Sequence, residues 1–175
     1  MKKIWHHTLA FTFLLFLLTG CGFHLRGHEP LPPQLRIMYF EPNSPYTALT
    51  KELRHSLQSM KITLVDSAKQ APVTLKVISD KFNQAVTSVG ASGQTSTYVI
   101  TYTVTFQLLD SHGNPIIPTQ TASSVHSYSI MTNQYLGGLS YQSSLQSQMQ
   151  REAVYQILDR LRSYNTRQAL QQIND

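Results

Sequence analysis

The stretch from Thr97 to Leu109 alternates between two kinds of side chain. One set is aromatic or bulky and apolar, whereas the other is dominated by threonine: Tyr98, Ile100, Tyr102, Val104, Phe106 and Leu108 alternate with Val99, Thr101, Thr103, Thr105 and Gln107. Because successive side chains of a β-strand point to opposite faces, the pattern predicts a strand with one apolar and one polar face. At about 3.3 Å per residue this strand spans about 43 Å, well beyond the usual length of roughly five or six residues. The fold must therefore accommodate one unusually long strand.

Other strands are predicted on either side of it. Val73, Leu75 and Val77 alternate with polar residues in a stretch that runs from Pro72 to about Val89. Residues 90–94 (GASGQ) are rich in turn formers and would join the two long strands as a hairpin. A second turn at residues 111–115 leads to a last strand around Thr121–Met131, and shorter strands are expected at Arg36–Phe40 and Ile62–Val65.

Two stretches repeat their apolar residues at helical spacing. The first is predicted to begin at Ser44-Pro45, with serine as the N-cap, and to end near Lys61. The second is predicted over residues 143–164, after a loop that contains Gly137-Gly138. The apolar stripes are Leu49, Leu53, Leu57 and Met60 in the first helix, and Leu145, Met149, Ala153, Ile157, Leu158 and Leu161 in the second.

The order of these elements is strand, helix, several antiparallel strands and helix. This order predicts an α+β fold, a two-layer sandwich with a mostly antiparallel sheet of four to five strands and two helices packed on one face. The domain is expected over residues 36–164, followed by a polar C-terminal tail at residues 165–175. The charged residues of the second helix are assigned mostly to its solvated face: Arg151, Glu152, Asp159, Arg160 and Arg162.

The first 20 residues have the pattern of a secretion signal. Lys2 and Lys3 are followed by a stretch from Leu9 to Leu18 that is apolar except for Thr12. Ten helical residues reach about 15 Å, half of a bilayer core of roughly 30 Å, so the stretch is too short for a stable membrane span. We therefore expect residues 1–20 to be a signal peptide. Loss of the two lysines would lower the net charge of the chain from +5 to +3.

The end of this signal resembles the lipobox of bacterial lipoprotein precursors. It reads Leu18-Thr19-Gly20-Cys21, and Cys21 would become the first mature residue, with a thioether-linked diacylglycerol and an amide-linked acyl chain such as palmitate. Two or three acyl chains form a stable membrane anchor, whereas one does not. The residue after Cys21 is Gly22 and not an aspartate, and in this the chain is similar to lipoproteins that are exported to the outer membrane of Gram-negative bacteria. Residues 21–35 contain three prolines and are expected to form an extended tether.

Residue patterns for catalysis, metal binding and nucleic-acid binding are absent from the sequence. There is no Gly-x-Ser-x-Gly elbow, phosphate-binding glycine loop or His-Glu-x-x-His pair. His24 and His28 lie in the predicted tether, and His126 is expected to be a half-buried strand residue rather than a base. The basic residues form no stripe. We therefore expect neither an enzyme, a metal site, a cofactor nor a nucleic-acid partner, and we place Asp66, Asp80 and Asp110 at strand ends or turns.

Charge is scarce and unevenly distributed. Charged residues make up 13% of the chain, against roughly 25% in typical globular proteins. Between Lys81 and Arg151 the only one is Asp110. A free sheet normally carries lysine or glutamate on its exposed face and edges, which prevents edge-to-edge association. The uncharged stretch therefore favours a surface that is enclosed in the working state, although a merely Ser/Thr-rich surface is the alternative.

With these features the chain resembles the LptE family of lipopolysaccharide-assembly lipoproteins. The most specific match is Cys21–Gly27 (CGFHLRG) directly after the lipobox, together with the hairpin that contains Ser88-Val89 and Gly93-Gln94-Thr95. The resemblance covers essentially the whole chain. It implies a plug inside the lumen of LptD, a large outer-membrane β-barrel, which it also helps to assemble. The implied role is delivery of lipopolysaccharide to the outer leaflet, from a lipid-anchored position on the periplasmic side and within the barrel lumen.

The resemblance also implies contacts at the hairpin. Members of the family have been proposed to bind lipopolysaccharide through basic residues, one of them in this loop, but the loop here has no cation. Either the loop then has a structural role, or Lys76, Lys81 or other basic residues contact the glycolipid. The candidate contacts with the partner or lipopolysaccharide are Gly90, Ala91, Ser92, Gly93 and Gln94. Two alternatives stay open. A periplasm-facing lipid- or glycolipid-binding lipoprotein predicts a wide apolar cavity between sheet and helices, and a structural lipoprotein would tether other envelope components.

Overall fold

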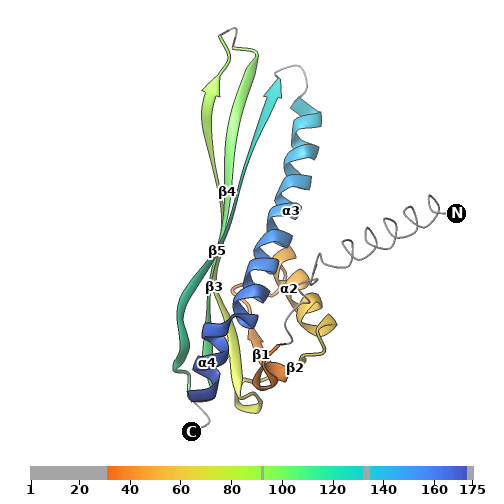
Figure 1. Ribbon diagram of the computed structural model, residues 1–175. Helices are drawn as coiled ribbons and strands as arrows, with labels where there is room; N and C mark the ends of the chain where they lie inside the picture. Colours follow the sequence, from red (N-terminus) through yellow and green to blue (C-terminus); the bar gives the residue numbers. More distant parts are fainter. Residues whose placement is uncertain (1–30, 92, 132–134, 173–175) are drawn as a thin grey trace, which may run out of the picture. The chain divides into compact units, whose positions relative to one another are not determined.

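The computed structural model describes residues 31–91, 93–131 and 135–172 (Figure 1). The predicted signal peptide, Cys21 and most of the predicted tether lie outside the described residues, as does Ser92 of the hairpin loop. The described part from Leu31 onward belongs to one compact unit.

Five strands form a single sheet in the order β2-β1-β3-β4-β5. Strand β1 runs parallel to both β2 and β3, whereas β3, β4 and β5 pair antiparallel as two successive hairpins. These hairpins supply most of the pairing, so the prediction of a mostly antiparallel sheet is confirmed. The strands are β1 (Ile37–Glu41), β2 (Thr63–Val65), β3 (Val73–Val89), β4 (Thr95–Asp110) and β5 (Pro115–Met131).

The long two-faced strand predicted from the alternation is β4, which is 16 residues long. Its even-numbered side chains from Ile100 to Leu108 are buried against the helices, and the intervening threonines are only partly covered. At the middle of β4, Tyr102 pairs with Phe82 of β3 and Ser124 of β5. The register of β3 shifts between Val77 and Ser79 and again between Val86 and Ser88, as at β-bulges.

Within the described residues, three α-helices lie on one face of the sheet, where two were predicted (Figure 1). They are α2 (Ala48–Ser59), α3 (Tyr135–Arg162) and α4 (Tyr164–Gln172), and short 3-10 turns occur at η1 (Pro33–Arg36) and η2 (Ala68–Gln70). Helix α4 occupies the segment that we expected to be a polar tail. The segment is polar in composition, so the helical spacing of Thr166 and Leu170 was not recognised. These two residues are four positions apart, and both are buried.

Helix α2 begins later than predicted. Its N-cap is Thr47 and not Ser44, since the Thr47 hydroxyl accepts a hydrogen bond from the Thr50 backbone N–H at 3.2 Å. Ser44 contributes its carbonyl oxygen instead, which accepts a bond from the Thr50 hydroxyl at 2.6 Å. The apolar stripe is confirmed, because Leu49, Leu53 and Leu57 are buried.

Helix α3 begins eight residues earlier than predicted, so Gly137-Gly138 lies within a helix and not in a loop. A glycine inside a helix costs about 1 kcal/mol relative to alanine, which is why the pair indicated a loop. The structure provides a reason for Gly138. A Cβ atom at this position would lie only 2.9–3.1 Å from three side-chain atoms of Ile130, so glycine permits the close approach of α3 to β5.

The core between sheet and helices is filled by side chains. Its largest fully buried members come from β1, α2, β3, β4 and α3: among them are Met38, Leu53, Leu75, Tyr102, Phe106, Met149 and Ile157. This packing of the described residues counts against the wide apolar cavity that a lipid-carrying module would need.

Candidate functional site

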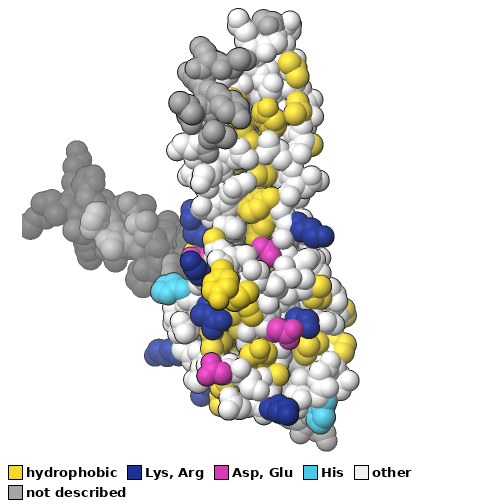
Figure 2. Space-filling model, turned by 180° about the vertical axis from the view of Figure 1, so that it is seen from behind, with side chains coloured by type: hydrophobic (Ala, Val, Ile, Leu, Met, Phe, Trp, Pro, Cys, Tyr) yellow, Lys and Arg dark blue, Asp and Glu magenta, His cyan; other side chains and the backbone are white. Residues whose placement is uncertain are grey.

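The part of the sheet farthest from β1 and β2 has no charged side chain. We call this part the distal sheet, and it comprises residues 82–89 of β3, 95–102 of β4 and 124–131 of β5. Figure 2 shows the same division on the visible surface, where lysine, arginine, aspartate and glutamate gather over one half of the molecule and leave the other half without them. The long uncharged stretch in the sequence therefore folds largely into one region.

One face of the distal sheet carries none of the described helices (Figure 1). On β4 and β5 many side chains of this face are threonine or serine. Thr97 pairs across these strands with Ser129, and their side-chain oxygens lie 3.0 Å apart, whereas Thr101 pairs with Val125. Lys81 of β3 lies on the same face just beyond the distal sheet, where it pairs in register with Thr103 of β4. The hydroxyl residues of this face are Thr97, Thr101, Ser127 and Ser129, and the pair Thr103 and Ser123 continues it just beyond the distal sheet.

The other face of the distal sheet is only partly covered. Helix α3 lies over β5 and β4, and Gln142 of α3 reaches β3 with a hydrogen bond of 3.0 Å to Gln84. Along β3, Phe82 stacks on Tyr102 with ring centroids 4.1 Å apart, but Phe82, Val86 and Val89 keep 37–59% of their surface exposed. This combination of a hydroxyl face and an exposed apolar stripe is unusual for a free surface, since larger apolar patches mark interaction sites.

The hairpin between β3 and β4 is closed by its own backbone. Gly90 donates its N–H to the carbonyl of Thr95 at 2.8 Å, and Gly93 donates to the carbonyl of Gly90 at 2.8 Å. Gly93 has φ +69, a left-handed conformation that favours glycine. The described candidate contacts Gly90, Ala91, Gly93 and Gln94 thus share one exposed, uncharged turn. Their role as contacts stays a prediction.

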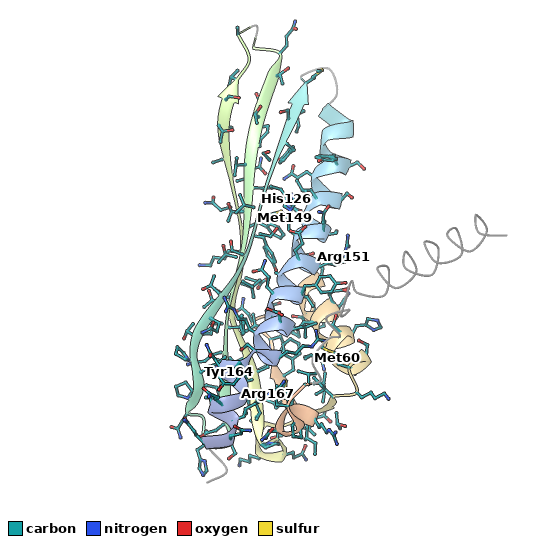
Figure 3. All side chains as sticks on the ribbon, in the orientation of Figure 1. Met60, His126, Met149, Arg151, Tyr164 and Arg167 are labelled. Atoms are coloured by element: carbon teal, nitrogen blue, oxygen red, sulfur yellow. The ribbon has the colours of Figure 1, made fainter. Side chains whose placement is uncertain are left out.

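A polar cluster joins β5 to α3. Its strand residue His126 is labelled beside α3 in Figure 3. Glu152 accepts hydrogen bonds from the Ser124 hydroxyl at 2.5 Å and from Gln148 at 2.9 Å, and His126 Nε2 lies 2.9 Å from its Oε2. The hydrogen bond from Ser124, followed by that from His126, lowers the pKa of Glu152 to about 2. His126 is half-buried, as expected, but Glu152 is not on the solvated face to which the sequence assigned it.

The geometry of this cluster is not that of a nucleophile and its base. The Ser124 hydroxyl is directed to the carboxylate of Glu152, so it has no hydrogen bond to an imidazole that would accept its proton. Among residues 31–91, 93–131 and 135–172 there is also no group of three side chains that could hold a metal ion. The cluster is therefore best explained as a polar connection between strand and helix.

Two of the three aspartates that we expected at strand ends or turns, Asp110 and Asp80, accept hydrogen bonds from other residues. Asp110 lies at the β4–β5 turn and accepts the backbone N–H groups of Asn114 and His112 at 2.8 Å, and these bonds lower its pKa. Asp80, which we expected at a strand end or turn, lies in the middle of β3. It accepts the Tyr102 hydroxyl at 3.4 Å, and burial followed by the charge of Asp80 raises the pKa of Tyr102.

No helix in the described part of the chain is both long and apolar enough to cross a membrane.

Comparison with known proteins identifies related sequences. Residues 33–161 match the family described as LptE: Lipopolysaccharide-assembly. The LPS-assembly lipoprotein LptE of Pectobacterium atrosepticum is 31% identical over 103 residues, which cover 58% of this chain and 56% of the relative. The protein of the same name in Yersinia enterocolitica is 32% identical over 96 residues, covering 54% and 46% respectively. The chain thus spans about half the length of the curated relatives it matches.

Solved structures share the fold. Lipoprotein B from Nitrosomonas europaea superposes with a TM-score of 0.65 at 22% identity, covering 81% of this chain and 88% of that one. The rare lipoprotein B from Shewanella oneidensis gives a TM-score of 0.64 at 19% identity, covering 71% and 92%. At these identities the likeness confirms the α+β architecture.

Proposed function

Because the chain belongs to the LptE lipopolysaccharide-assembly family, we propose that it is a non-enzymatic lipoprotein that plugs, and helps to assemble, the outer-membrane barrel LptD. In this role it supports the delivery of lipopolysaccharide to the outer leaflet. The lipid anchor is the diacylglycerol and the N-acyl chain on Cys21, and no other cofactor is involved. The protein is then held at the outer membrane on the periplasmic side, with the distal sheet inside the barrel lumen.

The observation that carries this proposal is the absence of charge from the described distal sheet, combined with its hydroxyl face. The interior of a large outer-membrane barrel is polar. Threonine and serine both donate and accept hydrogen bonds, so they can face a polar wall without leaving a desolvated charge unpaired. Lysine or glutamate at the same positions would cost several kcal/mol on enclosure unless the wall supplied a partner.

The proposal is tested by a pair of substitutions at Thr101, whose side chain is partly exposed on the hydroxyl face. Thr101→Asp introduces a charged side chain that is too short to reach solvent from an enclosed face. Thr101→Asn introduces a side chain of nearly the same shape as aspartate, but without the charge. We expect the lipidated Asp variant to recover at least about tenfold less barrel from outer membranes than the Asn variant. Equal recovery by both variants would contradict enclosure of this face.

A direct contact test uses a photocrosslinking residue in place of Thr101 in intact cells. We expect an adduct with a protein of the barrel's size, and no such adduct from the same residue in place of Gln58, which is exposed on α2. Cys21→Ser serves as the control for the anchor, because it should block lipidation and signal processing. A lipidated chain that is crosslinked only to other proteins would refute the barrel as partner.

A further inference from the structure

A pocket of about 380 Å³ lies at the end of the distal sheet, where β5 ends and α3 passes over it. It is formed by the start of β4, the last residues of β5 and the first turns of α3: its lining includes Thr95, Tyr128, Ser129, Ile130, Met131 and Tyr141. Its volume is within the range of roughly 300–1,000 Å³ that small-molecule sites occupy. Gly138 of α3 also lines the pocket.

Aromatic rings form a large part of its wall. Tyr128 stacks on Tyr98 with ring centroids 5.3 Å apart, and Tyr141 lies tilted at 58° with its centroid 6.1 Å from that of Tyr128. Tyr128 is buried, whereas Tyr141 leaves 55% of its surface exposed. A ring of Tyr141 is thus available to a molecule that enters from solvent, next to aromatic rings held in place by the fold.

The hydroxyl of Tyr128 is a polar atom without a partner. It is closed off from water, and it has no hydrogen-bond partner among the described residues. A buried hydroxyl left unpaired costs about 1–3 kcal/mol, so such a group in a pocket wall calls for an explanation. The ring of Tyr141 lies next to that of Tyr128, and because it is exposed it can change rotamer on a fast timescale; a ligand that reaches the Tyr128 hydroxyl requires such a movement.

The chemistry of the pocket selects a neutral ligand. None of its described lining residues is charged, and Thr95 and the two tyrosines stand beside the apolar side chains of Ile130 and Met131. A phosphate or carboxylate would find no cation here among the lining side chains. A sugar ring matches the wall, because its C–H faces pack on aromatic rings and its hydroxyls exchange hydrogen bonds with tyrosine and threonine.

We propose that this pocket binds a neutral sugar ring, which packs on Tyr141 and supplies the missing hydrogen-bond partner of the Tyr128 hydroxyl. The ring has two possible sources, the saccharide part of lipopolysaccharide or an unrelated neutral glycan. The first source rests on the proposed function, whereas the sugar site itself does not. The site shares Ser129 with the hydroxyl face of the distal sheet that the barrel proposal uses, but Tyr128 and Tyr141 lie together on the opposite side, toward α3.

The test is a titration of the full mature lipidated chain in detergent, in the absence of any barrel. The probes are the dephosphorylated core oligosaccharide of lipopolysaccharide, maltotriose, and lipid A, with binding followed by saturation-transfer NMR. We expect Tyr128→Phe and Tyr141→Ala each to weaken binding of a neutral sugar at least about fivefold. Tyr155→Ala is the matched control, because Tyr155 is 72% exposed and lies about 21 Å from Tyr141 along α3.

Binding of the core oligosaccharide alone would assign the sugar to lipopolysaccharide, and binding of both saccharides would assign the pocket to neutral sugars in general. The proposal is overturned if neither saccharide binds, if only lipid A binds, or if both pocket variants bind as the unchanged chain does. Tyr128→Phe removes one unpaired oxygen and should not destabilise the free protein, so a loss of binding cannot be attributed to unfolding. Because no barrel is present in this titration, a lack of sugar binding would not contradict the barrel proposal. A lack of barrel recovery from outer membranes would in turn not contradict the sugar site.

Discussion

The side-chain amide of Gln156 on α3 forms hydrogen bonds with both main-chain groups of Ser123 on β5. The Ser123 N–H donates to Oε1 at 3.0 Å, and Nε2 donates to the Ser123 carbonyl at 2.8 Å. Strand β5 is the last in the sheet, so these groups face the side on which no strand pairs. The amide therefore acts as a one-residue substitute for a neighbouring strand and protects an edge that has no charged residue of its own.

Replacement of Gln156 by alanine should expose this edge. We expect a loss of about 0.5–1.5 kcal/mol in the free energy of unfolding, because two hydrogen bonds at a partly solvated site are removed. Hydrogen exchange of the Ser123 amide should become faster while that of the Phe106 amide in β4 does not change. Tyr155→Ala, one residue away and exposed, is the control for a general effect on α3. If Ser123 exchanges at the same rate in both variants, the amide does not protect the edge.

Glu152 gives a prediction for acid stability. Its pKa is lowered to about 2 from an ordinary value near 4.5 by bonds from Ser124 and His126. A carboxylate with a depressed pKa stabilises the fold above its unfolded pKa, and this contribution is lost as the pH falls through the folded pKa. The difference in melting temperature between the unchanged chain and Glu152→Gln should therefore be constant near neutrality and shrink between about pH 4.5 and pH 2. A difference that does not change over this range would show that the cluster does not hold the ionised carboxylate.

Periodic patterns predicted the elements whose faces are set by local spacing. The alternation of β4 and the apolar stripe of α2 follow from strand and helix geometry alone, so both were found in the sequence. Glu152 and Gln156 were not recognised because their partners on β5 are about 30 residues away, and a polar residue that faces solvent has the same spacing as one that faces a strand edge. The pocket between the start of β4, the end of β5 and α3 was missed for the same reason.

The ends of helices were the least predictable feature. Ser44-Pro45 has the chemistry of a helix start, but Thr47 supplies the cap, since the competing serine carbonyl is used by Thr50. Gly137-Gly138 resembles a loop in the sequence because glycine is unfavourable in helices. Only the contact between α3 and Ile130 shows what the second glycine permits.

A test of core packing is provided by Leu53, which is fully buried in α2. Leu53→Ala should reduce the free energy of unfolding by about 2–5 kcal/mol, since it removes buried methyl groups and leaves a cavity. Gln58→Ala, on the exposed side of the same helix, should stay within about 0.5 kcal/mol of the unchanged chain. Chemical denaturation measures both, and similar midpoints for the two variants would contradict the buried position of α2.

Gly138 offers the sharpest test of how α3 approaches β5. Alanine is favoured over glycine inside a helix by about 1 kcal/mol, so Gly138→Ala would stabilise an unobstructed helix. Here the added Cβ would lie 2.9–3.1 Å from the side chain of Ile130, and we expect a net loss of about 1–2 kcal/mol instead. The Ile130→Ala background removes the obstructing atoms, so the same substitution should become neutral or stabilising there. Ser140→Ala, at an exposed position of the same helix, controls for propensity alone. Thermal unfolding measures these variants. If Gly138→Ala stabilises the chain as much as Ser140→Ala does, α3 and β5 are not in close contact at this position.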